Sequence, residues 1–290
     1  MIKILKPSKK IILSENKKMY ASYFEKVCTL YNGDTYKVIA RLVMPSLISQ
    51  ICFSKNSKMF AIKTLIGFIY VYRVDTFKKI ATFKCSETQN MQPFEFTFSK
   101  DNKKIIDLVF TNYNLGYISI YDLKTKKEEI YFQGKNSVFE RIEYIDEKQE
   151  YFITGYDKLN LKKENRYFYA FMDLDNEKIR KVNLKNQLKK ITYSRVLNKT
   201  YSLGTGKDVN KIFKFNKRIY EIDGIVEDIN VSNNGEMLLT VNDKIIVMWD
   251  TKKYNMLKKF EMENINYVNF NREDTKLFMC SDEETVIYEL

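Results

Sequence analysis

Residues 226–262, VEDINVSNNGEMLLTVNDKIIVMWDTKKYNMLKKFEM, contain four short segments in which apolar and polar side chains alternate. Alternation with a period of two is typical of a β-strand with one buried face. Residues 233–235 (NNG) and 242–243 (ND) separate the first three segments, and both sequences favour tight hairpin turns. The stretch therefore predicts a four-stranded antiparallel sheet made from one continuous piece of chain.

The same pattern recurs along the whole chain. Each copy begins with an apolar strand that ends in a small polar residue and is followed by a polar turn. These marker residues are Ser14, Ser54, Ser99, Asp146, Ser194, Ser232 and Asn271. Their successive spacings are 40, 45, 47, 48, 38 and 39 residues. Seven copies of a four-stranded unit predict an all-β, seven-bladed β-propeller.

The dipeptide Trp249-Asp250 ends the third segment of residues 226–262. With it, the chain resembles the WD40-repeat β-propeller family, whose blades repeat about every 40 to 45 residues and carry this dipeptide. The chain departs from that family because it contains no histidine, so the Gly-His dipeptide and the His-containing hydrogen-bond tetrad are missing. A β-sandwich could use similar strands, but the period and the incomplete last repeat favour a WD40-like propeller.

The repeats predict a single domain over residues 1–290. The expected blades are residues 10–42, 48–84, 93–132, 138–184, 188–222, 226–262 and 265–290. The last of them has only three strands, whereas a spare strand at residues 2–6 precedes the first. In propellers that this chain resembles, one terminus completes the blade begun by the other. We therefore expect residues 2–6 to close the seventh blade, which would remove two exposed sheet edges.

The composition argues against catalysis and against bound metals or cofactors. The absence of histidine excludes Ser-His-Asp and Cys-His hydrolases and HExxH zinc enzymes. Cys28, Cys52, Cys85 and Cys280 form no CxxC pair, so we expect reduced thiols and neither a zinc site nor a disulfide framework. Residues 204–207 (GTGK) lack the spacing of a phosphate-binding loop. We expect no catalytic residue, no cofactor and no metal ligand.

The chain is basic, with 49 Lys and Arg against 37 Asp and Glu, a net charge of +12. Lysine on edge strands protects sheets from pairing edge to edge, so this charge alone does not indicate a nucleic-acid or membrane partner. Lysines interrupt the apolar residues of the N-terminus and the apolar stretch at residues 61–72. Neither a signal peptide nor a membrane span is expected, and we predict a cytoplasmic protein. The paired lysines expected on turns and outer strands are residues 126–127, 189–190, 252–253 and 258–259.

One region stands out as a candidate binding surface. Residues 156–166 (YDKLNLKKENR) join the second and third strands of the fourth blade and are much longer than the turn at residues 242–243. Residues 111–116, residues 204–210 and the linker at 85–93 should open on the same rim, and loops on a rigid scaffold commonly carry binding sites. The predicted partner-binding residues are Tyr113, Asn114, Tyr156, Lys158, Lys162, Lys163, Arg166 and Lys207.

The function that follows is a non-enzymatic protein-protein interaction platform of the WD40-propeller type, a scaffold, subunit or adaptor in an intracellular assembly. We expect it to bind an acidic partner through the loops of blades 3–5, because the Lys and Arg side chains there suit an acidic patch and Tyr and Arg are typical interface anchors. The alternative is a propeller that binds a polyanion, either RNA or an anionic lipid headgroup. A third class is an enzyme with carboxylates, Tyr or Lys at the mouth of the central channel. The sequence leaves the oligomeric state open.

Overall fold

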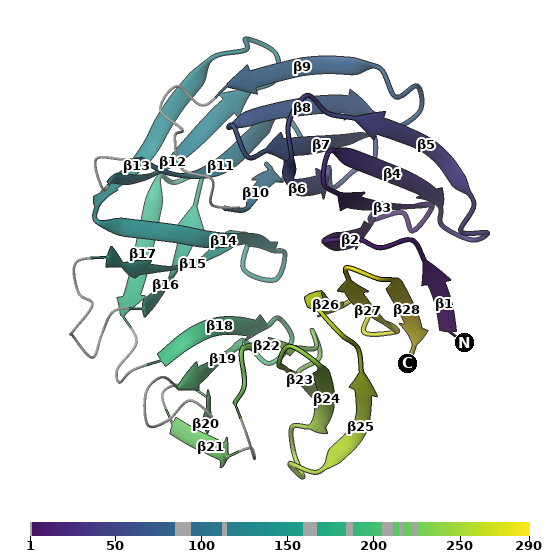
Figure 1. The fold of residues 1–290 in the computed structure, drawn as a ribbon. Helices are drawn as coiled ribbons and strands as arrows, with labels where there is room; N and C mark the ends of the chain where they lie inside the picture. The colour runs from purple at the N-terminus through teal and green to yellow at the C-terminus, as the bar shows by residue number, and fades with distance from the viewer. Residues whose placement is uncertain are drawn as a thin grey trace. The chain divides into compact units, whose positions relative to one another are not determined.

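The structure is a computed structural model, and it describes residues 2–84, 94–111, 115–158, 167–183, 188–204, 211–214, 217–221 and 225–290. The described residues form 28 strands and contain no α-helix. The strands pair into seven four-stranded sheets, and every pair with a described register is antiparallel (Figure 1). The prediction of an all-β chain built from seven four-stranded units is confirmed.

The strands belong to two compact units. The larger unit comprises Lys10–Leu159 and Ala170–Lys181, and the smaller unit comprises Met1–Lys9, Asn160–Tyr169 and Val182–Leu290. The first four sheets lie in the larger unit, except for residues 167–169 and 182–183 of the fourth sheet, which belong to the smaller unit. The remaining three sheets lie in the smaller unit. A single domain over residues 1–290 stays a prediction.

The sheets of the larger unit follow the order of the chain. The first sheet consists of β2 (Lys10–Leu13), β3 (Met19–Phe24), β4 (Val27–Asn32) and β5 (Val38–Val43). The second consists of β6 (Ile48–Phe53), β7 (Met59–Thr64), β8 (Phe68–Arg73) and β9 (Lys79–Lys84). The third consists of β10 (Phe96–Phe98), β11 (Lys104–Phe110), β12 (Leu115–Asp122) and β13 (Glu128–Lys135). The fourth consists of β14 (Ser137–Ile145), β15 (Glu150–Asp157), β16 (Tyr167–Asp173) and β17 (Lys178–Asn183).

The smaller unit contains the last three sheets, and one of them uses the N-terminal strand. The fifth sheet consists of β18 (Leu188–Ser194), β19 (Lys199–Gly204), β20 (Lys211–Lys214) and β21 (Lys217–Glu221). The sixth consists of β22 (Asp228–Val231), β23 (Met237–Val241), β24 (Ile245–Asp250) and β25 (Met256–Glu261). The seventh consists of β26 (Ile265–Phe270), β27 (Lys276–Ser281), β28 (Thr285–Glu289) and β1 (Ile2–Leu5). Because β1 pairs with β28, the predicted closure of the last sheet by the N-terminal strand is confirmed.

Within each unit the first strands of the sheets are neighbours. In the larger unit β6 contacts β2 and β10, and β10 also contacts β14 (Figure 1). In the smaller unit β22 contacts β18 and β26 in the same way. The sheets therefore run outward from their first strands, and the fourth strand of each sheet is its outer edge.

The residues that mark the repeats in the sequence build one turn motif between the first and second strands. In the second sheet the Ser54 hydroxyl donates to Asn56 Oδ1 at 2.8 Å and accepts the Met59 N–H at 2.9 Å. The same two contacts recur at Ser14, Ser99 and Ser232. The small polar residue is therefore a hairpin lock, because its side chain satisfies a backbone group of the next strand.

Each of the seven turns also contains one residue with positive φ, and glycine fills only one of these positions. The seven residues are Lys17, Ser57, Asn102, Gln149, Asn198, Gly235 and Asp274. The left-handed conformation costs a non-glycine residue about 1–2 kcal/mol, so the chain accepts this cost repeatedly and needs few glycines. Gly235 differs from the other six because a Cβ there would overlap the side chains of Leu197 and Ser194. Close packing, and not the positive φ alone, therefore requires glycine at that turn.

Hydrogen bonds join the turns of neighbouring sheets. In the larger unit the Asn16 N–H donates to Ser57 Oγ at 3.0 Å, and the Asn56 N–H donates to Asn102 Oδ1 at 3.2 Å. In the smaller unit the carboxylate of Asp274 accepts the N–H groups of two consecutive residues, 233 and 234, both at 2.8 Å. The turns thus form a connected edge within each unit.

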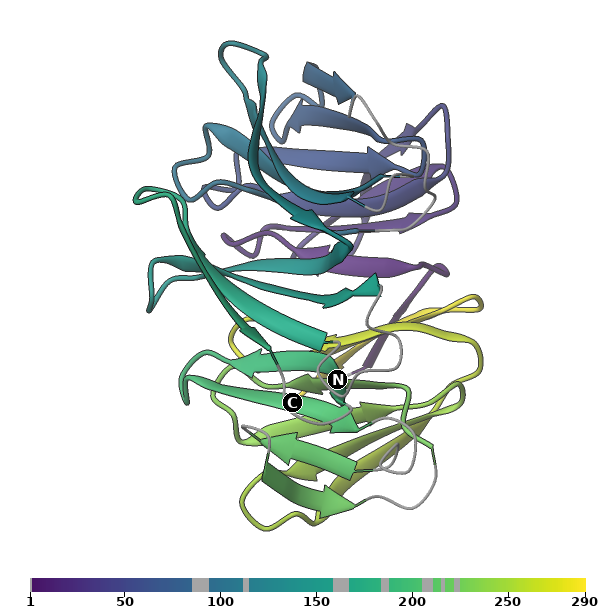
Figure 2. The same cartoon turned by 90° about the vertical axis from the view of Figure 1, so that its left-hand side faces the viewer.

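Apolar side chains fill the space between neighbouring sheets, which stack face to face within each unit (Figure 2). Buried residues of the first sheet, such as Leu30, pack against Ile62 and Phe60 of the second sheet. Aromatic rings add to this packing, and Phe83 of β9 stacks on Tyr121 of β12 with 4.9 Å between ring centroids. Alternating strands therefore bury both of their faces against adjacent sheets.

The acid expected at the end of the third strand braces the following turn in several sheets. Asp122 Oδ1 accepts the Thr125 N–H at 2.6 Å, and Asp250 Oδ1 accepts the Lys253 N–H at 2.7 Å. In the second sheet β8 ends at Arg73, and the acid Asp75 follows two residues later. Arg73 occupies the equivalent position there, and its guanidinium pairs with Asp75 at 2.5 Å.

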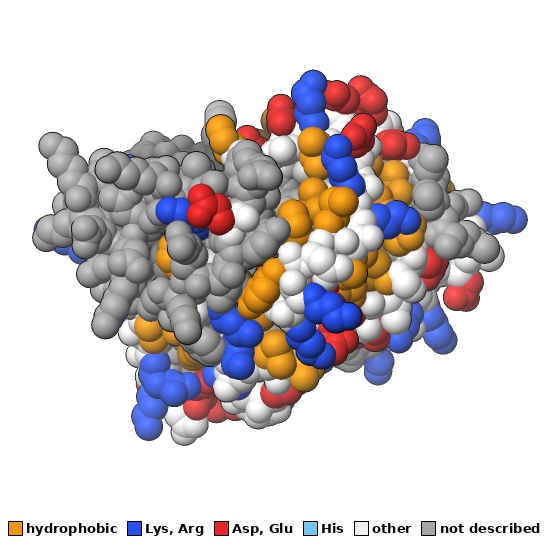
Figure 3. Space-filling view, turned by 90° about the horizontal axis from the view of Figure 1, so that it is seen from below, with side chains coloured by type: hydrophobic (Ala, Val, Ile, Leu, Met, Phe, Trp, Pro, Cys, Tyr) orange, Lys and Arg blue, Asp and Glu red, His pale blue; other side chains and the backbone are white. Residues whose placement is uncertain are grey.

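Most of the paired lysines lie on turns or outer strands, as their positions in the sequence predict. Residues 126–127 and 252–253 lie in turns, and residues 258–259 lie in the outer strand β25. Residues 189–190 are the exception, because they lie in β18, the first strand of its sheet. The edge drawn lowest in Figure 1, where β25 lies, exposes hydrophobic side chains among Lys and Arg (Figure 3).

Candidate functional site

The structure describes two of the eight residues of the predicted binding surface, Tyr156 and Lys158. The other six lie outside the described residues. They are Tyr113, Asn114, Lys162, Lys163, Arg166 and Lys207. The structure thus describes the strand ends that carry these loops.

Lys158 lies where the third and fourth sheets meet. It follows β15 directly, its side chain is exposed, and its N–H donates to the Asn136 carbonyl at 2.7 Å. Its ammonium lies 5.1 Å from the centroid of the Phe110 ring, at the end of β11. Tyr156 is half-buried in β15 and pairs with Val138 of β14. The loops at 111–116 and 156–166 therefore start from neighbouring points.

Close contacts fix this edge of the larger unit. A Cβ at Gly116 in β12 would overlap the carbonyl oxygen of Ser137 at the start of β14, so only glycine allows the two sheets to approach so closely. The Ser137 hydroxyl donates to Asp157 Oδ1 at 2.8 Å, and the same carboxylate pairs with Lys181 at 3.0 Å. The base beneath Lys158 is therefore held by packing, a hydrogen bond and an ion pair.

A buried hydroxyl lies at the end of β11 beside this edge. The Thr111 side chain is buried, and its Oγ1 has no hydrogen-bond partner among the residues that the structure describes. Its N–H donates to the Leu115 carbonyl at 2.8 Å, which closes the base of the loop between them. A buried hydroxyl is costly unless it is hydrogen-bonded, so Thr111 is a polar group at this edge that the described residues leave unsatisfied.

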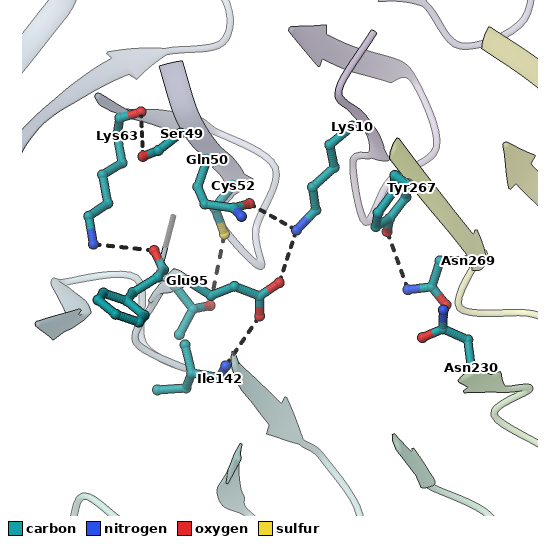
Figure 4. A network of polar contacts seen from close by, with 12 residues as sticks. Lys10, Ser49, Gln50, Cys52, Lys63, Glu95, Ile142, Asn230, Tyr267 and Asn269 are labelled. Carbon is teal, nitrogen blue, oxygen red and sulfur yellow. Dashed lines mark hydrogen bonds and ion pairs between the residues drawn. The ribbon is translucent and has the colours of Figure 1, made fainter. Parts of the chain in front are cut away.

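A second polar cluster joins the first strands of all four sheets of the larger unit (Figure 4). Lys10 of β2 donates to Gln50 Oε1 of β6 at 3.0 Å and to Glu95 Oε1 at 3.1 Å. Glu95 immediately precedes β10, and its Oε2 accepts the Ile142 N–H of β14 at 3.2 Å. One lysine and one carboxylate thus tie four strands together.

The carboxylate of Glu95 is held in its charged form. Burial by itself would raise its pKa, but the nearby charges of Lys10 and Arg141 and the hydrogen bonds outweigh burial. The pKa of Glu95 therefore lies below its usual value. Because the folded-state pKa is lower than that of the unfolded chain, charged Glu95 contributes stability above about pH 4.5 that is lost as the pH falls.

Glu95→Gln tests this contribution. We expect the variant to lose about 1–3 kcal/mol of unfolding free energy at pH 7, the range for a hydrogen bond to a charged group. The loss should shrink towards pH 3, where the wild-type carboxylate also becomes neutral. Urea unfolding at pH 7, 5 and 3 measures the difference, with Glu129→Gln on the exposed face of β13 as the control. A difference that stays constant over this range would contradict the assigned role.

Lys63 and Asp107 form a buried ion pair between the second and third sheets. Lys63 Nζ lies 2.5 Å from Asp107 Oδ1, and the two side chains are 6% and 0% exposed. The ammonium also donates to the carbonyls of Phe94 at 3.3 Å and Leu108 at 3.2 Å, so all three of its protons have acceptors. Burial raises the pKa of Asp107, and Lys63 opposes that rise. The second carboxylate oxygen, Oδ2, has no hydrogen-bond partner within the described ranges.

These two clusters hold sheets together and do not present reactive groups. Each carboxylate is engaged by an ammonium group, and the described residues contain no group of three or more His, Cys, Asp or Glu that could hold a metal ion. Cys28 and Cys280 are buried, and Cys52 is half-buried. Burial raises the pKa of Cys28 to about 12, so its thiol stays protonated and unreactive.

The buried charges are not evident from the sequence. Lys63 interrupts an apolar stretch there, and Asp107 lies within the similar stretch IIDLVF. The signal for a buried charge was a charged residue at a strand position where the alternation of apolar and polar residues predicts burial. Its partner could not be deduced, because Lys63 and Asp107 lie in different repeats.

Comparison with known proteins places the fold. No family model matches the chain, and no curated protein sequence matches it. Among solved structures, the chain is similar to the β-propeller domain of Cps50 (Swd1) from Myceliophteria thermophila, with a TM-score of 0.74 and 8% identity. The match covers 99% of this chain and 98% of that one. The chain is a seven-bladed β-propeller, as predicted.

This likeness extends to the fold alone. The all-β class, the seven sheets and the closing N-terminal strand are confirmed, whereas membership of the WD40 family stays a prediction based on Trp249-Asp250 and the repeat period. The described part of the chain has no helix that is both long and apolar enough to cross a bilayer.

Proposed function

We propose that this propeller is a non-enzymatic interaction platform in a cytoplasmic assembly. Its acidic protein partner binds the loop surface, which we define as residues 111–116, 156–166 and 204–210. The observation that carries the proposal is the position of Lys158, exposed beside Phe110 at the edge where Gly116 locks the third sheet against the fourth. Loops that begin from a fixed base lose less conformational freedom on binding.

The composition of the loop surface supports a partner of opposite charge. Residues 158–166 contain Lys158, Lys162, Lys163 and Arg166 against one acid, Glu164. Tyr113 and Tyr156 add aromatic anchors of the type enriched at interfaces. Positive loops steer an acidic partner toward the site and penalise a basic one, so charge here sets specificity as well as association rate.

Triple charge reversal tests the proposal. We expect Lys162→Glu, Lys163→Glu and Arg166→Glu together to abolish recovery of the partner in affinity capture followed by mass spectrometry. The control reverses three exposed lysines at the opposite ends of the strands, Lys18, Lys37 and Lys78, and should leave capture unchanged.

Two outcomes would overturn the proposal. One is the same set of captured proteins with the triple variant and the wild type. The other is recovery of RNA in place of any reproducible protein, with binding that weakens steeply as salt rises, which would favour a polyanion-binding propeller. Unfolding midpoints of both variants confirm that a loss of capture is not a loss of folding.

A further inference from the structure

The turn between β7 and β8 of the second sheet is apolar, although the fold does not require this. It reads Leu65-Ile66-Gly67, whereas the corresponding turns of the first, sixth and seventh sheets read EK at 25–26, NDK at 242–244 and DEE at 282–284. All of these join the second and third strands of a sheet. Polar residues can therefore join the second and third strands equally well, and the turn itself does not explain the apolar side chains of Leu65 and Ile66.

The apolar turn is part of a larger exposed group. Ile66 is 50% exposed, and Leu47, in the segment that joins the first and second sheets, is 43% exposed. The two segments lie side by side, because the Leu65 N–H donates to the Leu47 carbonyl at 2.9 Å. Pro45 is also exposed. We call Pro45, Leu47, Leu65 and Ile66 the Leu47–Ile66 surface. Leu65 is half-buried between them. Single exposed apolar side chains are ordinary, whereas a contiguous group from two segments is typical of an interaction site.

The charges that flank this surface are mainly positive. On one side the Lys26 carbonyl accepts the Met44 N–H at 2.8 Å, which places Lys26 beside the linker that carries Pro45 and Leu47. On the other side Lys84 lies opposite Phe68 and over its ring, 5.6 Å from the centroid. Neither lysine makes an ion pair with any residue in the described ranges, and Glu25 is the acid beside them.

We propose that the Leu47–Ile66 surface binds the apolar side chains of an acidic peptide segment of the partner. The proposal rests on the proposed function, since Ile66 and Lys158 both follow the second strand of their sheets and so lie at the same edge of the larger unit. A second copy of this chain is disfavoured as the occupant, because each copy carries a net charge of +12. Acidic residues of the segment face Lys26 and Lys84 while its apolar residues cover Ile66 and Leu47.

Fluorescence anisotropy with three labelled synthetic peptides tests this surface. The first is a 12-residue peptide of Asp and Glu with two Leu, the second has Ser in place of Leu, and the third has Lys in place of the acids. We expect the wild-type protein to bind the first peptide at least about tenfold more tightly than either of the others, equivalent to about 1.4 kcal/mol.

Ile66→Asp is the decisive variant. Ile66 is the second residue of its turn, and the sixth sheet has an aspartate, Asp243, at the same position of the corresponding turn. The fold should therefore accept aspartate at position 66. We expect it to weaken binding of the first peptide at least about tenfold, the size of an interface hot spot, and Leu47→Ser to act in the same direction. Val196→Asp, at a 67% exposed position of another turn, is the control and should bind as the wild type does.

The outcomes separate this proposal from the proposed function. Binding that is lost in Ile66→Asp and kept in the triple loop reversal supports the Leu47–Ile66 surface and contradicts the loop surface. The converse result overturns the Leu47–Ile66 surface and leaves the loop surface standing. Equal binding of the Leu and Ser peptides, or no binding of the first peptide, also overturns it.

Discussion

Replacing Lys63 by methionine is expected to lower the free energy of unfolding by about 3–5 kcal/mol. The substitution keeps most of the side-chain volume but leaves the Asp107 carboxylate buried, fully enclosed and without its counter-charge. Removing one partner of a buried ion pair has costs of this size, because the remaining charge can neither pair nor reach water. The carbonyls of Phe94 and Leu108 lose their donor at the same time.

The double variant Lys63→Met with Asp107→Leu distinguishes pairing from packing. It removes both charges, so we expect it to be more stable than Lys63→Met alone, since a buried ion pair often contributes little over an apolar pair of similar volume. Lys79→Met, at an exposed position of β9, should change stability by no more than about 0.5 kcal/mol. Urea unfolding curves measure all three. A single variant as stable as the wild type would show that Asp107 is neutral or solvated in the folded protein.

Removing residues 1–6 is expected to cost about 3–5 kcal/mol and to cause self-association. The strand β1 pairs with β28 at four positions, from Ile2 opposite Tyr288 to Leu5 opposite Thr285. Each lost backbone hydrogen bond is worth about 1 kcal/mol, and the deletion also exposes β28 as a new, unpaired sheet edge. Unfolding curves measure the loss of stability, and size-exclusion chromatography at several concentrations detects the association.

A synthetic peptide of residues 1–8 provides the control for this deletion. Added in excess, it should restore the unfolding midpoint and the monomeric elution volume, because it can pair with the vacant edge of β28. An eight-residue peptide with the same composition in scrambled order should restore neither. A truncated protein with an unchanged midpoint would contradict the role of β1 in closing the seventh sheet.

The sequence predicted the fold because the repeated turn carries its own signal. Ser54 and its counterparts form hydrogen bonds with residues two and five positions later in the same hairpin. The pattern is therefore local and can be recognised in the sequence without knowledge of the packing. The alternating strands that follow are equally local.

The buried ties between sheets could not be predicted in the same way. Lys10, Glu95 and Ile142 belong to three different repeats, and no spacing rule relates them. The exposed apolar turn at Ile66 was missed for another reason, since only comparison with the equivalent turns of the folded sheets makes it unusual.

Hydrogen-deuterium exchange of the propeller, alone and with its captured partner, tests most directly whether the loops of blades 3–5 form the binding surface. We expect hydrogen exchange to slow on binding within residues 111–116, 156–166 and 204–210. Exchange should stay unchanged in the turns around Ser14, Ser54 and Ser232, at the opposite ends of the strands. Protection confined to those turns or to the outer strands, with the loops unchanged, would contradict it.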